Sequence, residues 1–280
     1  MILNSVGIVG LGLMGGSLGL SLKHLLPNTK FIGYDHNETH KKDAIELKLV
    51  DKVTDNLNDI FDCELIILAI PVDGIIEILQ NIKSIPKEST IIDLGSTKKQ
   101  ICDNIPSSIR ENFVATHPMT GTEKNGPNAA FDGLYTGKTV VLCDTQKSGK
   151  AQLKLVEQMY KLLKMNIIRM DSTTHDENAA FISHMPHAIS FALANSVMKQ
   201  KDPKSIVALA GGGFRDMSRI AKSSPAMWES IFKQNKANVL DSIGYFKKEL
   251  EAFEKLLENE DFVALRAWMS DANKLHDILK

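Results

Sequence analysis

A glycine-rich turn near the N-terminus constrains the fold more than any other feature of this sequence. A short apolar run at residues 6–9 is followed at once by GLGLMG at residues 10–15, and leucines then recur at helical spacing over residues 16–26. A second β-like run at residues 30–34 ends in Asp35. Strand, glycine turn, helix, strand and terminal carboxylate, in this order, are typical of a βαβ unit that binds a dinucleotide.

Each residue of the turn has a physical role in that interpretation. Gly10 lets the chain turn sharply out of the strand, Gly12 lets the backbone approach a pyrophosphate, and Gly15 lets the helix pack close to the sheet. The phosphates are expected beside Leu13 and Met14, at the N-terminus of the helix, because free N–H groups and the helix dipole favour anions there.

Asp35 predicts which dinucleotide binds. It lies twenty residues beyond Gly15, where a carboxylate can accept hydrogen bonds from the hydroxyls of the adenosine ribose. A 2′-phosphate is repelled at that place, and the following His36 and Asn37 supply no arginine to hold it. The sequence therefore favours NAD over NADP. The alternative is a structural glycine turn in an α/β fold that binds no nucleotide.

Strand-like and helix-like segments alternate through the first 171 residues. Apolar runs at 64–70, 90–94, 113–116, 139–142 and 166–170 predict strands, and residues 72–82 and 151–164 predict helices. This alternation predicts a doubly wound parallel sheet, a Rossmann fold. Ligands of such sheets bind outside the carboxyl ends of the strands, where Pro71, Ser96 and His117 lie. We expect Pro71 beside the cofactor, and Ser96 and His117 are candidates for chemistry.

The character of the sequence changes near Ser172, after which strand-like runs disappear. Helical periodicity covers residues 176–199, 203–210, 225–257 and 261–279. We therefore predict an NAD-binding domain over residues 1–171 and an all-helical substrate and dimerisation domain over residues 172–280. Six aromatic residues at helical spacings are interpreted mainly as core, with some at a subunit interface: Phe181, Phe191, Phe232, Phe246, Phe253 and Trp268.

Two segments of the helical half differ from ordinary core sequence. SHMPH, at residues 183–187, places two histidines three residues apart beside a proline that can kink a helix. GGGFRDMSR, at residues 211–219, begins with three adjacent glycines, which are costly in backbone entropy within a helical domain. The glycines predict close approach to a ligand or to another backbone, and a simple loop between helices is the alternative.

Composition and charge exclude several classes of function. With 33 basic and 34 acidic residues the net charge is −1, so no nucleic-acid partner is expected. The three cysteines, Cys63, Cys102 and Cys143, are widely spaced and indicate reduced thiols rather than disulfides. No histidine is grouped with a cysteine, so no metal is expected. No stretch has the length and polarity of a signal or membrane segment, which predicts a cytoplasmic, soluble protein without a membrane partner.

Five motifs together resemble the prephenate and arogenate dehydrogenase family. They are GLGLMGGS at 10–17, DLGSTK at 93–98, THPMTGTEKNGP at 116–127, SHMPHA at 183–188 and GGGFRDMSRIAKSSPAMW at 211–228. The resemblance spans most of the chain. It implies NAD-dependent oxidative decarboxylation of prephenate to 4-hydroxyphenylpyruvate, on the route to tyrosine. It also implies a homodimer formed through the helical domain.

The resemblance also implies roles for individual residues. His117 corresponds to the catalytic histidine that accepts the hydroxyl proton as hydride leaves, and Ser96 to a partner that orients the same hydroxyl. Arg219 corresponds to the arginine that binds a substrate carboxylate, although a structural pair with Asp216 is an alternative. The other implied pocket residues, some at its entrance or across the subunit interface, are His187, His184, Thr122, Glu123 and Trp228.

Five histidines lack any supporting context and are predicted to be surface or ordinary packing residues: His24, His36, His40, His175 and His276. The chain starts at the first predicted strand and ends within the helical half, so we expect neither a chorismate mutase segment nor an added regulatory domain. Feedback by tyrosine is then expected to act at the active site, as inhibition competitive with prephenate.

Alternative functions remain open at this point. Specificity for arogenate, or for both cyclohexadienyl substrates, differs only in an amino group where prephenate has a keto oxygen. A β-hydroxyacid dehydrogenase also begins with a similar turn, but its glycine-rich helical KxxxN motif is not found in this sequence. An NAD-binding module that senses redox state without turnover is a third interpretation, against which His117, Ser96 and Arg219 argue together.

Overall fold

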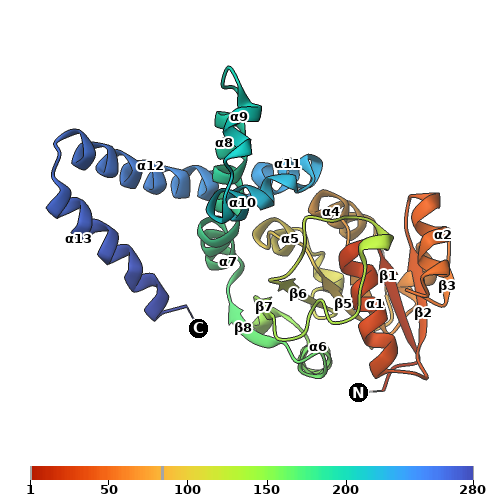
Figure 1. Cartoon of the computed structure of the whole chain (residues 1–280). Coiled ribbons are helices and arrows are strands. Elements are labelled where there is room, and N and C mark those ends of the chain that lie inside the picture. Colours follow the sequence, from red (N-terminus) through yellow and green to blue (C-terminus); the bar gives the residue numbers. More distant parts are fainter. Residues whose placement is uncertain (1, 83–84, 280) are drawn as a thin grey trace. The chain divides into compact units, whose positions relative to one another are not determined.

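Eight strands form one sheet in the first of two compact units of the computed structural model, which describes residues 2–82 and 85–279 (Figure 1). The first unit spans Met1–Asn235 and the second Lys236–Lys280. The strands are β1 (Ser5–Val9), β2 (Lys30–Tyr34), β3 (Lys52–Val53), β4 (Leu65–Leu68), β5 (Thr90–Asp93), β6 (Phe113–Pro118), β7 (Thr139–Cys143) and β8 (Asn166–Met170). Their order across the sheet is β3-β2-β1-β4-β5-β6-β7-β8.

The sheet is mostly parallel, which confirms the predicted fold class with one departure. Strands β1 to β6 pair in parallel, but β7 pairs with β6 in antiparallel fashion, and β8 follows the direction of β7. A parallel return requires a long crossover, usually a helix. The connection from β6 to β7 contains only the 3₁₀ turn Pro127–Ala129, so β7 runs back beside β6.

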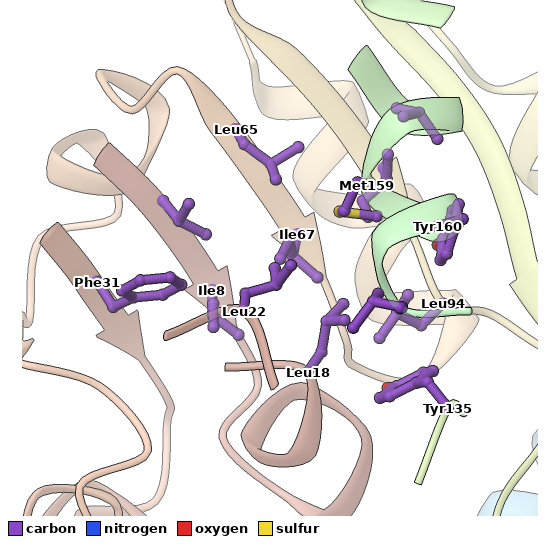
Figure 2. Packing of buried hydrophobic residues seen from close by; sticks show 14 of the residues in the cluster. Ile8, Leu18, Leu22, Phe31, Leu65, Ile67, Leu94, Tyr135, Met159 and Tyr160 are labelled. Carbon is purple, nitrogen blue, oxygen red and sulfur yellow. The ribbon is translucent and has the colours of Figure 1, made fainter. Parts of the chain in front are cut away.

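Helices cover both faces of this sheet, as its apolar strands require. They are α1 (Leu13–Leu25), α2 (Glu38–Glu46), α3 (Asn58–Phe61), α4 (Val72–Asn81), α5 (Lys99–Asp103) and α6 (Lys150–Leu162). Alternate residues of β4 belong to different buried clusters, one with α1 and α6 and the other with α3, α4 and α5. Figure 2 shows the first cluster, in which Leu18 and Leu22 of α1 pack near Ile67 of β4 and Tyr160 lies on α6.

The rest of the first unit is helical. Its elements are α7 (Ser172–Ala179), the π-helix Ala180–His184, α8 (Met185–Met198), α9 (Pro203–Ala208), α10 (Gly212–Arg219) and α11 (Pro225–Gln234). Pro186, in the first turn of α8, has no N–H to donate, and its ring crowds the carbonyl four residues earlier in an α-helix. The wider π turn just before it relieves that conflict, and such turns are frequent at functional sites.

The three glycines at residues 211–213 start helix α10 and do not form a loop between helices.

The second unit consists of α12 (Lys236–Glu258), α13 (Phe262–Asn273) and a short 3₁₀ turn. The single helix predicted over residues 225–257 is thus two helices, which separate at Asn235. In the single chain Phe181 and Phe246 are exposed and the other four of the six aromatic residues are half-buried, so none belongs to the core of one chain. That some of them lie at a subunit interface stays a prediction. Helices that expose apolar faces in one chain need a further surface to cover them. Among the described residues, no helix is long and apolar enough to cross a membrane.

Candidate active site

The glycine turn between β1 and α1 has the backbone geometry expected of a dinucleotide-binding turn. Gly10 has a φ of +93°, and a Cβ there would overlap the main chain of Ala69 at the end of β4. A Cβ on Gly15 would overlap the carbonyl oxygen of Gly10. The sharp turn and the close approach of helix to sheet therefore both depend on glycine.

The N-terminus of α1 is available to an anion. No side chain caps it at Gly12, and the first turn of this helix contains no acidic residue. A Cβ on Gly12 would have only Gly126 within 4 Å, at 3.9 Å. Because uncapped N–H groups at a helix start bind phosphates, the turn that carries Leu13 and Met14 fits a pyrophosphate.

Two more predicted cofactor residues lie at the same edge of the sheet. The strand order reverses between β1 and β4, which is where doubly wound sheets bind ligands, and Pro71 lies there as the residue that precedes α4. Asp35 follows β2 and is 5% exposed; its carboxylate accepts the main-chain N–H groups of Leu11 and Asn37, both at 2.9 Å. Asp35 therefore orders the glycine turn as well as marking the expected ribose position.

His117, the candidate base, lies at the end of β6 and belongs to a buried chain of hydrogen bonds. Its Nδ1 is 2.8 Å from Nε2 of His175, and Nδ1 of His175 is 2.7 Å from a carboxylate oxygen of Asp176. The Asp176 carboxylate also accepts the main-chain N–H groups of Lys98 and Lys99, at 2.7 and 2.9 Å. The chain thus runs from β6 through α7 to the loop that follows β5.

The direction of these hydrogen bonds follows from their acidic end. Burial opposes ionisation of Asp176, but the bonds from His175 and the two main-chain N–H groups lower its pKa below the ordinary value. A carboxylate only accepts, so Nδ1 of His175 carries a proton and its Nε2, when the ring is neutral, accepts the N–H of His117. His117 is then left with a lone pair on Nε2, which is the arrangement that a proton acceptor needs.

The electrostatics keep His117 neutral. Burial lowers the pKa of its ring well below the ordinary value of a histidine, and the nearby His175 and Lys98 lower it further. A neutral imidazole can take a proton, and the Asp176 carboxylate at the far end of the chain favours the positive charge that this produces.

His175 corrects the sequence interpretation, which placed it among surface or ordinary packing residues. It is 2% exposed and contacts the candidate base directly. No regular spacing relates it to His117, since 58 residues separate them, and only the adjacent pair His175-Asp176 could have suggested a role. The other four histidines of that group take no part in this hydrogen-bonded chain.

A second buried network supports the strand beneath His117. The ammonium of Lys98 pairs with the carboxylate of Asp93 and donates to the main-chain oxygen of Thr116 at 2.8 Å, and both charged side chains are wholly buried. The hydroxyl of Thr116 bonds to the main chain of Asp93 and to Tyr160, at 2.5 and 2.8 Å. Three residues, Asp93 of β5, Tyr160 of α6 and Lys98 of the loop after β5, therefore hold Thr116, which precedes His117.

Ser96 lies, half-buried, in the loop between β5 and α5. Because β5 and β6 are parallel neighbours, this loop and His117 share one edge of the sheet. The next residue, Thr97, donates to the side-chain oxygen of Gln234 on α11 at 2.6 Å. The loop that carries Ser96 is thus held against the helical part of the first unit.

His184, His187 and Trp228 form a polar and aromatic cluster beside this chain. Trp228 stacks on His187 with ring centroids 3.6 Å apart and meets His184 edge-on at 5.9 Å. His187 donates from Nδ1 to the main-chain oxygen of Ser183 at 2.8 Å. The side-chain amide of Asn235 donates to the main-chain oxygen of Asp176 and also lies 3.0 Å from Nδ1 of His184. Asn235 therefore joins this cluster to the His175–Asp176 pair.

Arg219 ends α10 and lies 3.7 Å from the carboxylate of Glu123, which comes from the connection after β6. The ionic partner of this arginine is thus Glu123 rather than Asp216. Both side chains are partly exposed, and Thr122 beside them is exposed as well. Nothing lies within 4 Å of a Cβ built on any of the three glycines at 211–213, so the single chain gives no close approach there.

Within residues 2–82 and 85–279 there is no group of three or more histidine, cysteine or acidic side chains suited to hold a metal ion. The three cysteines are buried and unpaired with one another. The site thus consists of a nucleotide-binding turn, a buried histidine with its hydrogen-bonded chain, the cluster of His184, His187 and Trp228, and the Arg219–Glu123 pair.

Comparisons with known families match both halves of the chain. A family model described as the nucleotide-binding domain of prephenate dehydrogenase matches residues 18–169, and one described as the dimerization domain of the same enzyme matches residues 171–271. The chain therefore carries matches to both the nucleotide-binding and the dimerization domain of this family.

Individual relatives agree over nearly the full length. The chain is 31% identical to a prephenate dehydrogenase of Bacillus subtilis (strain 168), over 98% of this chain and 76% of that protein. It is 29% identical to a cyclohexadienyl dehydrogenase of Zymomonas mobilis, over 98% and 96%. The crystal structure of prephenate dehydrogenase from Aquifex aeolicus in complex with hydroxyphenyl propionate and NAD+ superposes with a TM-score of 0.92, at 32% identity, covering 100% of this chain and 99% of that one.

Proposed function

Because the chain belongs to the prephenate dehydrogenase family, we propose that it oxidises and decarboxylates prephenate to 4-hydroxyphenylpyruvate with NAD, in tyrosine biosynthesis. The observation that carries the proposal is the buried chain His117–His175–Asp176, which leaves a lone pair on Nε2 of His117. The oxidation removes the hydroxyl proton and takes a hydride from the carbon that bears this hydroxyl. The residue that accepts the proton must be neutral and have a free lone pair.

His117 accepts the proton of the ring hydroxyl on Nε2, and Ser96, from the neighbouring loop, hydrogen-bonds the same hydroxyl and orients it. NAD held at the glycine turn of Gly10–Gly15 would supply the acceptor for the hydride of the carbinol carbon. As His117 takes up the proton, His175 accepts the N–H of its Nδ1, and Asp176 stabilises the positive charge through His175. Loss of carbon dioxide follows because it completes an aromatic ring.

Arg219 binds a carboxylate of the substrate, since prephenate is a dianion and a guanidinium can donate two parallel hydrogen bonds to a carboxylate. Its contact with Glu123 is long and partly exposed, and such pairs contribute about 0–1 kcal/mol. A substrate carboxylate can therefore replace Glu123 at little energetic cost. His187 and His184 line the same pocket, with Thr122, Glu123 and Trp228 at its edge.

NAD is the proposed cofactor because the residues present fit it. Gly12, Leu13 and Met14 offer an uncapped helix start for the pyrophosphate, and Asp35 disfavours a 2′-phosphate. The family structure from Aquifex aeolicus contains NAD+. We place the boundary between the nucleotide-binding and helical domains at residues 171 and 172. We also propose a homodimer through the helical domain, which carries many exposed apolar side chains in the single chain.

The alternative is that the enzyme acts on arogenate, alone or together with prephenate, and one observation supports this alternative. The relative from Zymomonas mobilis is named a cyclohexadienyl dehydrogenase and is nearly as similar to this chain as the prephenate dehydrogenase of Bacillus subtilis. An amino group in place of the keto oxygen leaves the hydroxyl chemistry at His117 unchanged, so the proton path does not distinguish the two substrates.

The test is NADH formation by the purified chain with prephenate and, in parallel, with arogenate, each with NAD or NADP. We expect turnover with prephenate and NAD, and a loss on the order of 10²- to 10⁴-fold in kcat for His117→Asn. His276→Asn, which changes an exposed histidine, is the matched control and keeps wild-type kcat. Turnover with arogenate alone changes the substrate but keeps the mechanism. No turnover with either substrate overturns the proposal.

A further inference from the structure

Two buried nitrogens of the aromatic cluster have no hydrogen-bond partner. Within the described residues, Nε2 of His184 and Nε1 of Trp228 are the buried side-chain nitrogen or oxygen atoms left without one. His184 is wholly buried and Trp228 is 5% exposed. A buried polar group without a partner loses its bonds to water and gains nothing in exchange, so natural proteins rarely keep one without a functional reason.

Both orphan nitrogens are donors. The indole N–H of Trp228 can only donate. For His184 the proton position follows from Asn235, whose side-chain nitrogen lies 2.7 Å from the main-chain oxygen of Asp176 and is therefore its NH₂ group. That NH₂ also faces Nδ1 of His184 at 3.0 Å, so Nδ1 accepts and the proton of the neutral ring is on Nε2. Burial lowers the pKa of His184 to about 4, which keeps the ring neutral.

Two donors cannot satisfy each other, although the rings are edge to face. What both require is a shared acceptor, such as a carbonyl or carboxylate oxygen. His187 differs: its Nδ1 donates to Ser183, so its free nitrogen accepts, and the half-buried ring is more accessible to water. Bulk water can hydrogen-bond the free nitrogen of half-buried His187 but cannot reach the two buried donors. A ligand acceptor therefore gains more free energy at the two donors than at His187.

We propose that Nε2 of His184 and Nε1 of Trp228 form a subsite for the keto oxygen of the substrate side chain, and that this subsite selects a 2-keto acid over the corresponding 2-amino acid. The inference rests on the proposed function and adds a determinant of its substrate class. An ammonium brings only further donors to two N–H groups, whereas a keto oxygen has two lone pairs.

The position of the cluster agrees with this role. His175 and His184 lie on one continuous helical segment, α7 followed by the π-helix, so the His184 donor is tied to the hydrogen-bonded chain that serves the hydroxyl at the other end of the substrate. Trp228 comes from α11 and stacks on His187. The hydroxyl of Ser190 on α8 donates to the main-chain oxygen of Met217 on α10 at 2.7 Å, which ties the helix that carries His187 to the helix that ends at Arg219. Both orphan nitrogens are closed to solvent in the single chain, so the proposal requires the Trp228 indole to move when a substrate enters.

The kinetic test compares kcat/KM for prephenate and arogenate in four variants, of which two remove a donor and two are controls. Trp228→Phe keeps an aromatic ring on His187 but removes the N–H, and His184→Met removes the other donor. We expect each to lower the prephenate-to-arogenate preference by about tenfold, since one unpaired donor in a site costs roughly that factor. His184→Gln, which can still present an N–H, is expected to keep most of the preference. Phe232→Leu disturbs the packing against Trp228 without removing a donor and leaves the preference unchanged.

A binding measurement separates this inference from the proposed reaction. Calorimetric titration of the NAD-loaded chain with 4-hydroxyphenylpyruvate, hydroxyphenyl propionate and tyrosine compares keto, unsubstituted and ammonium groups beside the same carboxylate. We expect affinity to fall in that order for the wild type, and the keto advantage to disappear in Trp228→Phe. If the wild type turns over neither substrate but this order holds, the proposed function fails and the subsite stands. If prephenate is turned over but neither Trp228→Phe nor His184→Met changes the substrate preference or the affinity order, the subsite is refuted.

Discussion

Replacing His175 by leucine isolates the contribution of the buried chain behind the base. The substitution preserves volume but removes the acceptor that faces Nδ1 of His117 at 2.8 Å and the donor that faces Asp176 at 2.7 Å. His175 is 2% exposed and lies behind His117, so the change affects the proton acceptor rather than the surface that binds substrate. We expect kcat to fall with little change in KM for prephenate.

The magnitude follows from the charge that His117 carries in the transition state. Its N–H to His175 becomes a bond from a cationic donor, and hydrogen bonds to charged groups contribute about 1.5–3 kcal/mol. At 1.36 kcal/mol per factor of ten, kcat is expected to fall roughly ten- to 150-fold. This loss is smaller than that of His117→Asn, because the base itself remains.

The assay is NADH formation at saturating prephenate and NAD, with urea unfolding and NAD affinity measured on the same samples. His175→Gln, whose amide oxygen can accept the same N–H, is expected to recover part of the rate. Asn178→Leu, an exposed position on the same helix, serves as the control for the added leucine. A folded His175→Leu variant that keeps kcat within twofold of wild type would refute a role of the hydrogen-bonded chain His117–His175–Asp176 in the proton transfer.

Three further outcomes are expected. Lys98→Met leaves Asp93 charged and unpaired in the interior and should lower the free energy of unfolding by about 3–5 kcal/mol in urea titrations; a loss below about 1 kcal/mol contradicts the buried pair. Because neutral His117 is the active form and its pKa is lowered, kcat/KM should stay constant as pH falls through the ordinary histidine value of about 6.5 and decline only at lower pH; a decline centred above it contradicts the burial argument. Asp35→Asn should narrow the preference for NAD over NADP at least about fivefold in kcat/KM, and an unchanged ratio removes Asp35 from cofactor selection.

The nucleotide-binding half could be predicted from sequence because its signals are local. Gly10, Gly15 and Asp35 are fixed by the geometry of one turn and two adjacent strands, and their order alone predicts the unit. The direction of β7 could not be predicted in the same way, because the alternation of apolar residues is the same in parallel and antiparallel strands. It depends on the connection after β6, where no crossover helix forms.

The chemical environment of the site was harder to predict because its contacts are distant in sequence. His175 meets His117 across 58 residues, and Asp176 meets Lys98 across 78. Neither pair leaves a periodic signal. Whether the aromatic residues of the helices are core or interface could not be predicted for another reason: helical spacing predicts an apolar face but not whether this chain or a second copy covers it.

One helical segment connects recognition to chemistry in this fold. In the proposed mechanism, His175 and Asp176 of α7 take up the charge of the proton transfer, while His184 and His187 follow across the π-helix and line the proposed substrate pocket. Asn235 bridges the two functions, since its amide contacts the main chain of Asp176 and the ring of His184. A helix of uniform pitch sets the angle between side chains by sequence spacing alone, whereas the wider turn before Pro186 changes that angle locally. The π-helix therefore lets one rigid element direct two histidines into a substrate pocket and a third toward the base, a placement that a loop could not hold as firmly.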